Sequence, residues 1–255
     1  MRQTPTVEVA SAPGVRRLTL NRPPLNILTT AMMQELESAL RTAADDRTTR
    51  VIVLASGGKA FSAGVDVGEH TRDQAPGMIR AFHGLCRTLV EIDVPTIAGV
   101  AGPALGGGCE VAALCDIVVA AESATFGQPE ITVGVFPPVA AAAFPLLLGK
   151  PGHAVVLLGE IFPAERAREL GLVTEVVPDG EVEAAVDRRV RALTALSAPV
   201  LRLAKRAAMA GFRRQFADAL DHAEQIYLGE LMATADAHEG LEAFLAKRRP
   251  VWRNS

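Results

Sequence analysis

Short runs of aliphatic residues alternate along the first half of this chain with longer segments of helical periodicity. The run at 51–54 is unbroken, and similar runs occur at 96–100 and 116–120, which is typical of strands buried on both faces of a sheet. Between them, apolar residues recur at spacings of three and four, the pattern of helices with one buried face. The expected helices are 29–46, 75–92 and 106–115. This alternation predicts an α/β fold with a mainly parallel sheet.

The two ends of the chain depart from this alternation. Strands are expected at 7–10 and 17–20, joined in a hairpin by the turn residues 12–14. Helices are expected near the C-terminus at 181–196, 199–211, 214–231 and 234–247. We therefore divide the chain into a core at 1–195 and a C-terminal helical region at 196–255, which is expected to pack on the core or on a neighbouring subunit.

Composition excludes several classes of protein. Of the 255 residues, 49% are hydrophobic and 22% are charged, which excludes disorder over most of the chain. A net charge of −3 gives no electrostatic footprint for nucleic-acid binding. The three cysteines form no C-x-x-C pair, so neither a disulfide scaffold nor a zinc ribbon is expected.

The sequence also argues against a membrane protein. The N-terminus has no apolar segment of the kind found in signal peptides. The uncharged stretch 131–149 contains three prolines, which disfavour a continuous membrane-spanning helix. We expect a cytoplasmic protein with neither membrane nor nucleic-acid partners.

Basic residues are missing from the middle of the chain. No Lys or Arg occurs between Arg87 and Lys150. Of the few acidic residues there, Asp116 and Glu122 bracket an expected strand and fit its exposed ends, but Glu110 and Glu130 stand among apolar residues and glycines. A carboxylate without a compensating charge has a raised pKa, which suits general acid–base catalysis. The alternative is that each glutamate is a solvated residue at a helix end.

Glycines add a second feature to this region. Gly107 lies three residues before Glu110, so a helix would place both on one face. Backbone N–H groups at the start of a helix bind developing negative charge. Val65, which follows a buried strand and a glycine turn, could supply a second N–H to form an oxyanion hole with Gly107. The alternative is that the glycines only permit close packing of strand and helix.

Other catalytic motifs are absent from the sequence. The residues around Ser62 lack the first glycine of G-x-S-x-G, and there is no P-loop, no dinucleotide-binding G-x-G-x-x-G and no zincin H-E-x-x-H. The histidines show no metal-ligand spacing, so each is expected to lie at the surface or at a helix cap. They are His70, His83, His153, His222 and His238.

Taken together, these segments resemble the enoyl-CoA hydratase/isomerase (crotonase) family over essentially the whole chain. The matching motifs are 21–23 (NRP), 61–66 (FSAGVD), 104–110 (ALGGGCE), 126–130 (FGQPE), 171–173 (GLV) and 244–248 (FLAKR). The resemblance implies a crotonase-like α/β spiral of ββα units. It also implies a C-terminal helical region that builds a homotrimer, often stacked as a dimer of trimers, and an acyl-CoA thioester substrate.

The resemblance also assigns roles to residues. It places the oxyanion hole at Val65 and Gly107 and the two catalytic glutamates of the hydratase branch at Glu110 and Glu130. Presence of both glutamates favours hydration of the 2,3-double bond. Glu110 is then expected to activate the water and Glu130 to deliver the proton. No metal is expected, and coenzyme A enters only as part of the substrate.

Substrate contacts are implied in the same way. Coenzyme A is expected to contact Ala63 and Asp66 on one loop, and Phe244 and Lys247 near its adenine end, often from a neighbouring subunit.

One segment departs from the family pattern. Where many hydratases have a Pro-Gly-Ala-Gly-Gly-Thr loop, this chain has 135–141 (VFPPVAA). Phe136, Pro137 and Pro138 are expected to line the acyl end of the site. The segments 62–70 and 134–140 resemble the branch that hydrates cyclic dienoyl-CoA thioesters. Hydration of an ordinary enoyl-CoA remains the leading expectation; a cyclic dienoyl-CoA, isomerisation or hydrolysis of another acyl-CoA, and a non-catalytic binding module are the alternatives.

Overall fold

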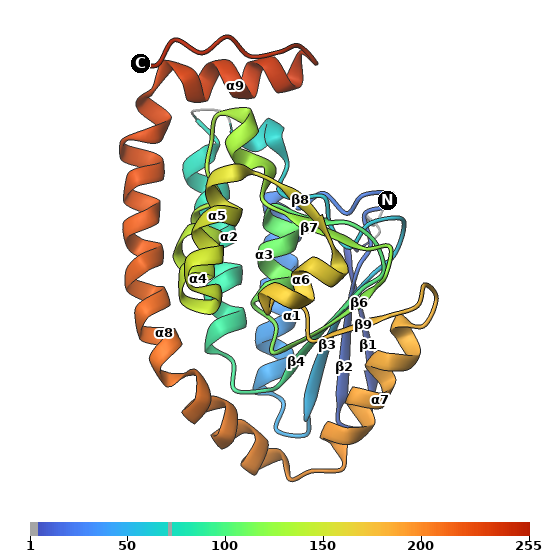
Figure 1. The fold of residues 1–255 in the computed structure, drawn as a ribbon. Coiled ribbons are helices and arrows are strands. Elements are labelled where there is room, and N and C mark those ends of the chain that lie inside the picture. Colours follow the sequence, from blue (N-terminus) through green and yellow to red (C-terminus); the bar gives the residue numbers. More distant parts are fainter. Residues whose placement is uncertain (1–4, 71–72) are drawn as a thin grey trace.

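Two β-sheets organise the chain in the computed structural model, which describes residues 5–70 and 73–255. Within these residues, the larger sheet has the strand order β1-β2-β3-β4-β6-β9 and the smaller one β5-β7-β8 (Figure 1). The strands of the larger sheet are β1 (Val7–Ala12), β2 (Val15–Leu20), β3 (Val51–Ser56), β4 (Thr96–Val100), β6 (Ile117–Ala121) and β9 (Glu175–Val177). Those of the smaller sheet are β5 (Ala104–Leu105), β7 (Thr125–Gly127) and β8 (Ile161–Pro163).

The larger sheet is parallel except at its first pair. β1 and β2 form the expected hairpin, whose turn contains Gly14 with φ of +77°. Every later pair in this sheet is parallel, beginning with the register Val15↔Val51 between β2 and β3. Residues 51–54 are all buried, as their unbroken apolar run predicts. The predicted α/β core with mainly parallel pairing is therefore confirmed.

Successive units of two strands and a helix build the core. β4 belongs to the larger sheet and is followed by β5 in the smaller sheet and then by helix α3 (Gly107–Ala113). β6 repeats this course: β7 follows in the smaller sheet and then the 3₁₀ helix η2 (Pro129–Val133). β5 and β7 are parallel neighbours with the register Ala104↔Phe126. The elements that follow these two strands therefore start side by side.

Helices cover both faces of the larger sheet (Figure 1). Helix α1 (Thr30–Asp45) buries one face, which includes Met33, Leu36, Leu40 and Ala43. On the other face of the sheet, α7 (Val182–Thr194) packs so closely on β4 that a Cβ at Gly99 would contact the side chains of α7. The other helices are η1 (Val67–His70), α2 (Ala75–Glu91), α4 (Pro138–Leu148), α5 (Lys150–Leu158), α6 (Ala164–Leu170), α8 (Ala198–Gly229), η3 (Leu231–Ala233) and α9 (Ala235–Leu245).

The C-terminal region differs from the prediction in one respect. Two helices were expected at 199–211 and 214–231, but α8 is continuous over 32 residues. A glycine inside a helix costs only about 1 kcal/mol, and Gly211 does not end this one. Just beyond it, Arg213 donates hydrogen bonds to the Val90 carbonyl and to Asp93, which hold α8 against the end of α2. In Figure 1, α8 runs along one side of the molecule and α9 lies across its end.

The uncharged segment 131–149 folds as the end of η2 followed by α4, which is only 11 residues long. Over the described ranges, no helix is long and apolar enough to cross a membrane.

Candidate active site

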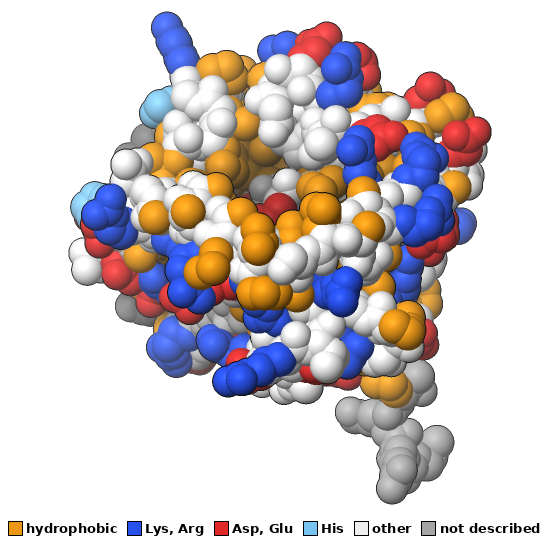
Figure 2. All heavy atoms as spheres, turned by 90° about the horizontal axis from the view of Figure 1, so that it is seen from below, with side chains coloured by type: hydrophobic (Ala, Val, Ile, Leu, Met, Phe, Trp, Pro, Cys, Tyr) orange, Lys and Arg blue, Asp and Glu red, His pale blue; other side chains and the backbone are white. Residues whose placement is uncertain are grey.

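A mainly apolar cavity of about 180 Å³ opens where η1, α3, η2 and α4 meet the C-terminal helices. Its wall includes Val65, Phe82 and Phe136, and its acidic groups are Glu110 and Glu130. Figure 2 shows a hollow on one face of the molecule, surrounded mainly by hydrophobic side chains and with acidic atoms inside, which is the distribution that these lining residues predict.

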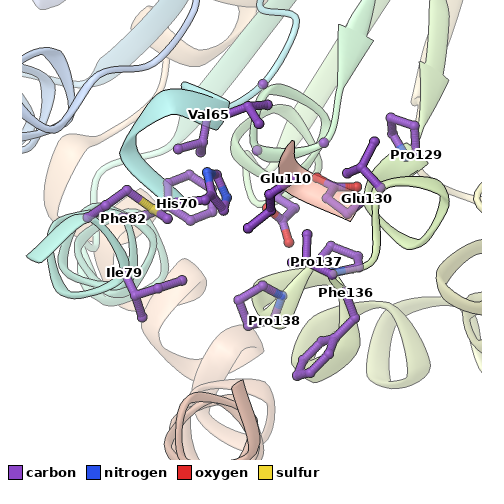
Figure 3. A pocket seen from close by; sticks show the side chains of 18 of the residues that line it. Val65, His70, Ile79, Phe82, Glu110, Pro129, Glu130, Phe136, Pro137 and Pro138 are labelled. Atoms are coloured by element: carbon purple, nitrogen blue, oxygen red, sulfur yellow. The ribbon is translucent and has the colours of Figure 1, made fainter. Parts of the chain in front are cut away.

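Glu110 and Glu130 converge in this cavity (Figure 3). Glu110 comes from the first turn of α3 and Glu130 from η2, the two elements that follow the paired strands β5 and β7. Glu110 is only 2% exposed, whereas Asp116 and Glu122 are exposed as expected. The interpretation of Glu110 as a solvated helix-end residue is therefore wrong.

Gly106 allows the Glu130 side chain to reach its position. A Cβ at this residue would overlap with Glu130 Oε1. Its φ of +51° is also a conformation that favours glycine. Gly106, the first of three consecutive glycines, thus leaves room for the Glu130 carboxyl group.

The start of α4 supplies the polar partners of Glu110. The Ala140 N–H donates a hydrogen bond of 2.5 Å to Glu110 Oε1, and the Val139 N–H also points to this carboxyl group. Pro138 occupies the first position of the helix, where no N–H is needed. By contrast, Glu130 Oε2 is buried and has no hydrogen-bond partner within the described part of the chain.

Burial raises the pKa of both carboxyl groups. It raises the pKa of Glu130 to about 7, and it raises that of Glu110 well above its usual range, with the neighbouring charge of Glu130 as the second cause. Two such close carboxylates do not both ionise readily, so the pair retains a proton near neutral pH. The N–H donors at Glu110 favour its ionised form and so oppose the effects of burial and of the Glu130 charge on its pKa.

Two backbone N–H groups lie beside the carboxyl pair. Val65 and Gly107 are in contact, because a Cβ at Gly107 would lie 2.7 Å from Val65 Cγ2. A parallel bridge at Ser62↔Ala104 holds the two segments together, and a second bridge joins Val65 to Leu28. Among the described residues, neither the Val65 N–H nor the Gly107 N–H has an acceptor. Both groups are therefore available to a ligand oxygen.

The other residues singled out in the sequence fall into two groups. Those that line the cavity are Ala63, Phe136, Pro137, Pro138 and Phe244. Asp66 and Lys247 do not line it: the Asp66 carboxylate accepts the Gly68 N–H, and Lys247 is exposed beyond the end of α9. Phe244 reaches the cavity from α9 of the same chain.

Of the five histidines expected at the surface or at caps, His83 is buried and His70 is half-buried at the end of η1. His70 lines the cavity, its Nδ1 is 3.0 Å from the Asp66 carbonyl oxygen, and burial lowers its pKa. His83 is 2% exposed and pairs with Glu224 of α8. Tyr227, the only tyrosine of the sequence, also lines the cavity. No pattern in the sequence indicates this position of Tyr227, because it depends on how α8 packs.

Comparison with known proteins identifies the family. Residues 11–255 match the family model described as enoyl-CoA hydratase/isomerase. The chain belongs to this family. It is thus an enzyme, a hydro-lyase with the crotonase fold, and the family implies an acyl-CoA thioester as substrate.

Individual relatives cover nearly the whole chain. The cyclohexa-1,5-dienecarbonyl-CoA hydratase of Thauera aromatica is 38% identical over 93% of this chain and 92% of its own length. The 2,3-dehydroadipyl-CoA hydratase of Escherichia coli is 38% identical over 92% of this chain and 94% of its own length. The crystal structure of an enoyl-CoA hydratase from Mycobacterium avium subsp. paratuberculosis superposes with a TM-score of 0.87 at 31% identity, covering 97% of this chain and 98% of that one.

Proposed function

We propose that the protein adds water across the 2,3-double bond of an acyl-CoA thioester to give a 3-hydroxyacyl-CoA. The observation that carries this proposal is the pair of carboxyl groups, Glu110 buried and Glu130 half-buried, facing one apolar cavity beside two N–H groups without acceptors. Conjugate addition of water needs a base for the water, an acid for the α-carbon of the acyl group and donors for the thioester oxygen. This site offers all three.

In the proposed reaction, the thioester oxygen accepts hydrogen bonds from the Val65 and Gly107 N–H groups. Glu110 takes a proton from a water molecule as the water oxygen bonds to the β-carbon, and the electrons of the double bond move onto the thioester oxygen as an enolate. Glu130 then gives its proton to the α-carbon and the carbonyl re-forms. Loss of one oxyanion donor typically costs about 10²–10³ in rate, and loss of a proton-transfer group about 10²–10⁴.

The hydrogen bonds support this division of roles. The hydrogen bond from the Ala140 N–H favours the carboxylate form of Glu110, which suits a base. Glu130 has a buried oxygen without a partner and a pKa raised to about 7, which suits an acid that is protonated at neutral pH. Coenzyme A enters this reaction only as part of the substrate.

The dimensions of the cavity favour a compact acyl group. Its volume of about 180 Å³ compares with an engineered apolar cavity of about 150 Å³ that binds benzene. A six-membered ring therefore fits, as does a short straight chain. A cyclic dienoyl-CoA is the second candidate substrate, supported by this volume and by the similarity to the Thauera aromatica enzyme.

A dicarboxylic acyl group is less well matched. The Escherichia coli relative is named for 2,3-dehydroadipyl-CoA, whose acyl chain ends in a carboxylate. The described lining of this cavity contains no Lys or Arg that could pair with that charge, and burial lowers the pKa of its His70.

The coenzyme A portion is proposed to lie outside this small cavity. Ala63 and Phe244 line the cavity and would lie along the thioester arm of the substrate. Asp66 and Lys247 stand away from the lining, where they could contact the more distant part of the nucleotide.

Loss of enoyl-thioester ultraviolet absorbance tests the function, with crotonyl-CoA and cyclohexa-1,5-diene-1-carbonyl-CoA compared side by side. Fast hydration of crotonyl-CoA is expected for an ordinary hydratase, and hydration of the cyclic diene alone would assign the second candidate. Glu110→Gln and Glu130→Gln should each reduce turnover at least 100-fold. Purified protein that hydrates neither thioester would contradict the proposal.

A further inference from the structure

The hydroxyl group of Tyr227 is buried without a partner. The residue lies in the last turn of α8 and is 1% exposed. Within the described ranges, its hydroxyl oxygen makes no hydrogen bond. A buried hydroxyl without a partner destabilises a protein, so such a group calls for an explanation. This one lines the same cavity as Glu110 and Glu130.

Packing fixes the direction of this side chain. The rings of Tyr227 and Phe136 make a T-shaped contact, with 5.3 Å between the ring centroids and an interplanar angle of 70°. Phe136 stands just before α4 and also lines the cavity (Figure 3). Burial first, and then the charges of Glu130 and Glu110, raise the pKa of Tyr227, so its hydroxyl stays protonated. Among the described residues, Tyr227 is therefore a free hydrogen-bond donor in the cavity that Glu110 and Glu130 also line.

In the proposed reaction, the other donors of the site have partners besides the attacking water: the Glu130 proton goes to the α-carbon. A water molecule between the two glutamates can give its protons to carboxyl oxygens while one lone pair attacks the β-carbon, so its second lone pair needs a donor. The start of α4 supplies none, because Pro137 and Pro138 carry no N–H and the N–H groups of Val139 and Ala140 face Glu110. The Val65 and Gly107 N–H groups are committed to the thioester oxygen in the proposed reaction.

We propose that the Tyr227 hydroxyl donates a hydrogen bond to the attacking water, and in the reverse reaction to the 3-hydroxyl group that leaves. Tyr227 is then a third catalytic residue, which turns a lone pair of the water toward the β-carbon. This inference rests on the proposed hydratase function. It assigns to the C-terminal region a group that acts in the chemical step.

The test compares two reactions in wild type and Tyr227→Phe. Hydration needs the held water, whereas exchange of the α-protons of butyryl-CoA in deuterium oxide needs only Glu130 and the two N–H groups. Phenylalanine keeps the ring contact with Phe136. The variant is expected to lose about tenfold in kcat for hydration, to keep KM within about twofold, and to exchange α-protons at the wild-type rate. Exchange is followed by proton nuclear magnetic resonance.

Glu130→Gln is the matched control, because it should lose hydration and exchange together. The inference is overturned if Tyr227→Phe hydrates at the wild-type kcat, if only its KM changes, or if exchange falls as much as hydration. A thermal melt checks the fold, and removal of the orphan hydroxyl should leave the melting temperature unchanged or raise it. Wild type without hydratase activity would contradict the proposed function itself, an outcome distinct from a fully active Tyr227→Phe.

Discussion

Glu130 lowers the stability of the folded chain at the pH at which it is proposed to work. Its pKa is raised from 4.5 to about 7, so folding stability linked to its proton is present below about pH 4.5 and is lost as the pH rises through 7. We expect Glu130→Gln to be inactive yet more stable than wild type at pH 8, by at most about 3 kcal/mol. Urea unfolding at pH 5 and pH 8 measures this, and the difference should be larger at pH 8. If the variant exceeded wild type in stability by the same amount at pH 5 and at pH 8, the raised pKa of Glu130 would be contradicted.

The shared proton also predicts how activity depends on pH. Hydration requires Glu130 protonated and Glu110 ionised, so kcat/KM should fall as the pH rises through about 7. It should also fall in acid, where Glu110 takes up a second proton. Dehydration uses the same number of protons on the pair, with their positions exchanged. The plot of kcat/KM against pH should therefore be the same bell-shaped curve in both directions. A flat curve between pH 6 and 9 would be evidence against a shared proton.

At the scale of single elements, α8 carries a glycine that nothing in its surroundings requires. A Cβ at Gly211 would meet no atom within 4 Å, and its backbone is helical. Gly211→Ala should therefore raise the free energy of unfolding by about 0.5–1 kcal/mol. Gly149 is the matched control: it also has open space, but its φ is +65°. Gly149→Ala should destabilise the fold, and chemical denaturation of both variants measures the difference.

Helices and strands were predicted correctly where they are long enough to show a regular period. The hairpin, α1, α2, β3 and β4 agree with the expected ranges to within a few residues, because each buries a regular face. The short strands β5, β7, β8 and β9 were not predicted, since two or three residues are too few to show a period. The position of α4 was also obscured by its uniformly apolar composition and its prolines.

At the scale of the whole molecule, exposed leucines predict self-association. Leu157 and Leu158 of α5 are 68% and 59% exposed, and Leu146 and Leu147 of the adjacent α4 are also exposed. Apolar patches of this kind mark interaction surfaces. We expect a homotrimer or a dimer of trimers, and the double variant Leu157→Asp, Leu158→Asp should shift the mass measured by light scattering toward smaller species. A monomeric wild type would contradict this expectation.

Local patterns in the sequence determined the alternation of strands and helices, the hairpin, and the two glutamates left without a nearby basic residue. Those features depend on neighbours along the chain. The tertiary structure alone decided which groups meet: the Ala140 N–H as the partner of Glu110, and Tyr227 of α8 in the cavity. Contacts between residues so far apart depend on how β5, β7 and α8 pack, and no spacing within one segment records that.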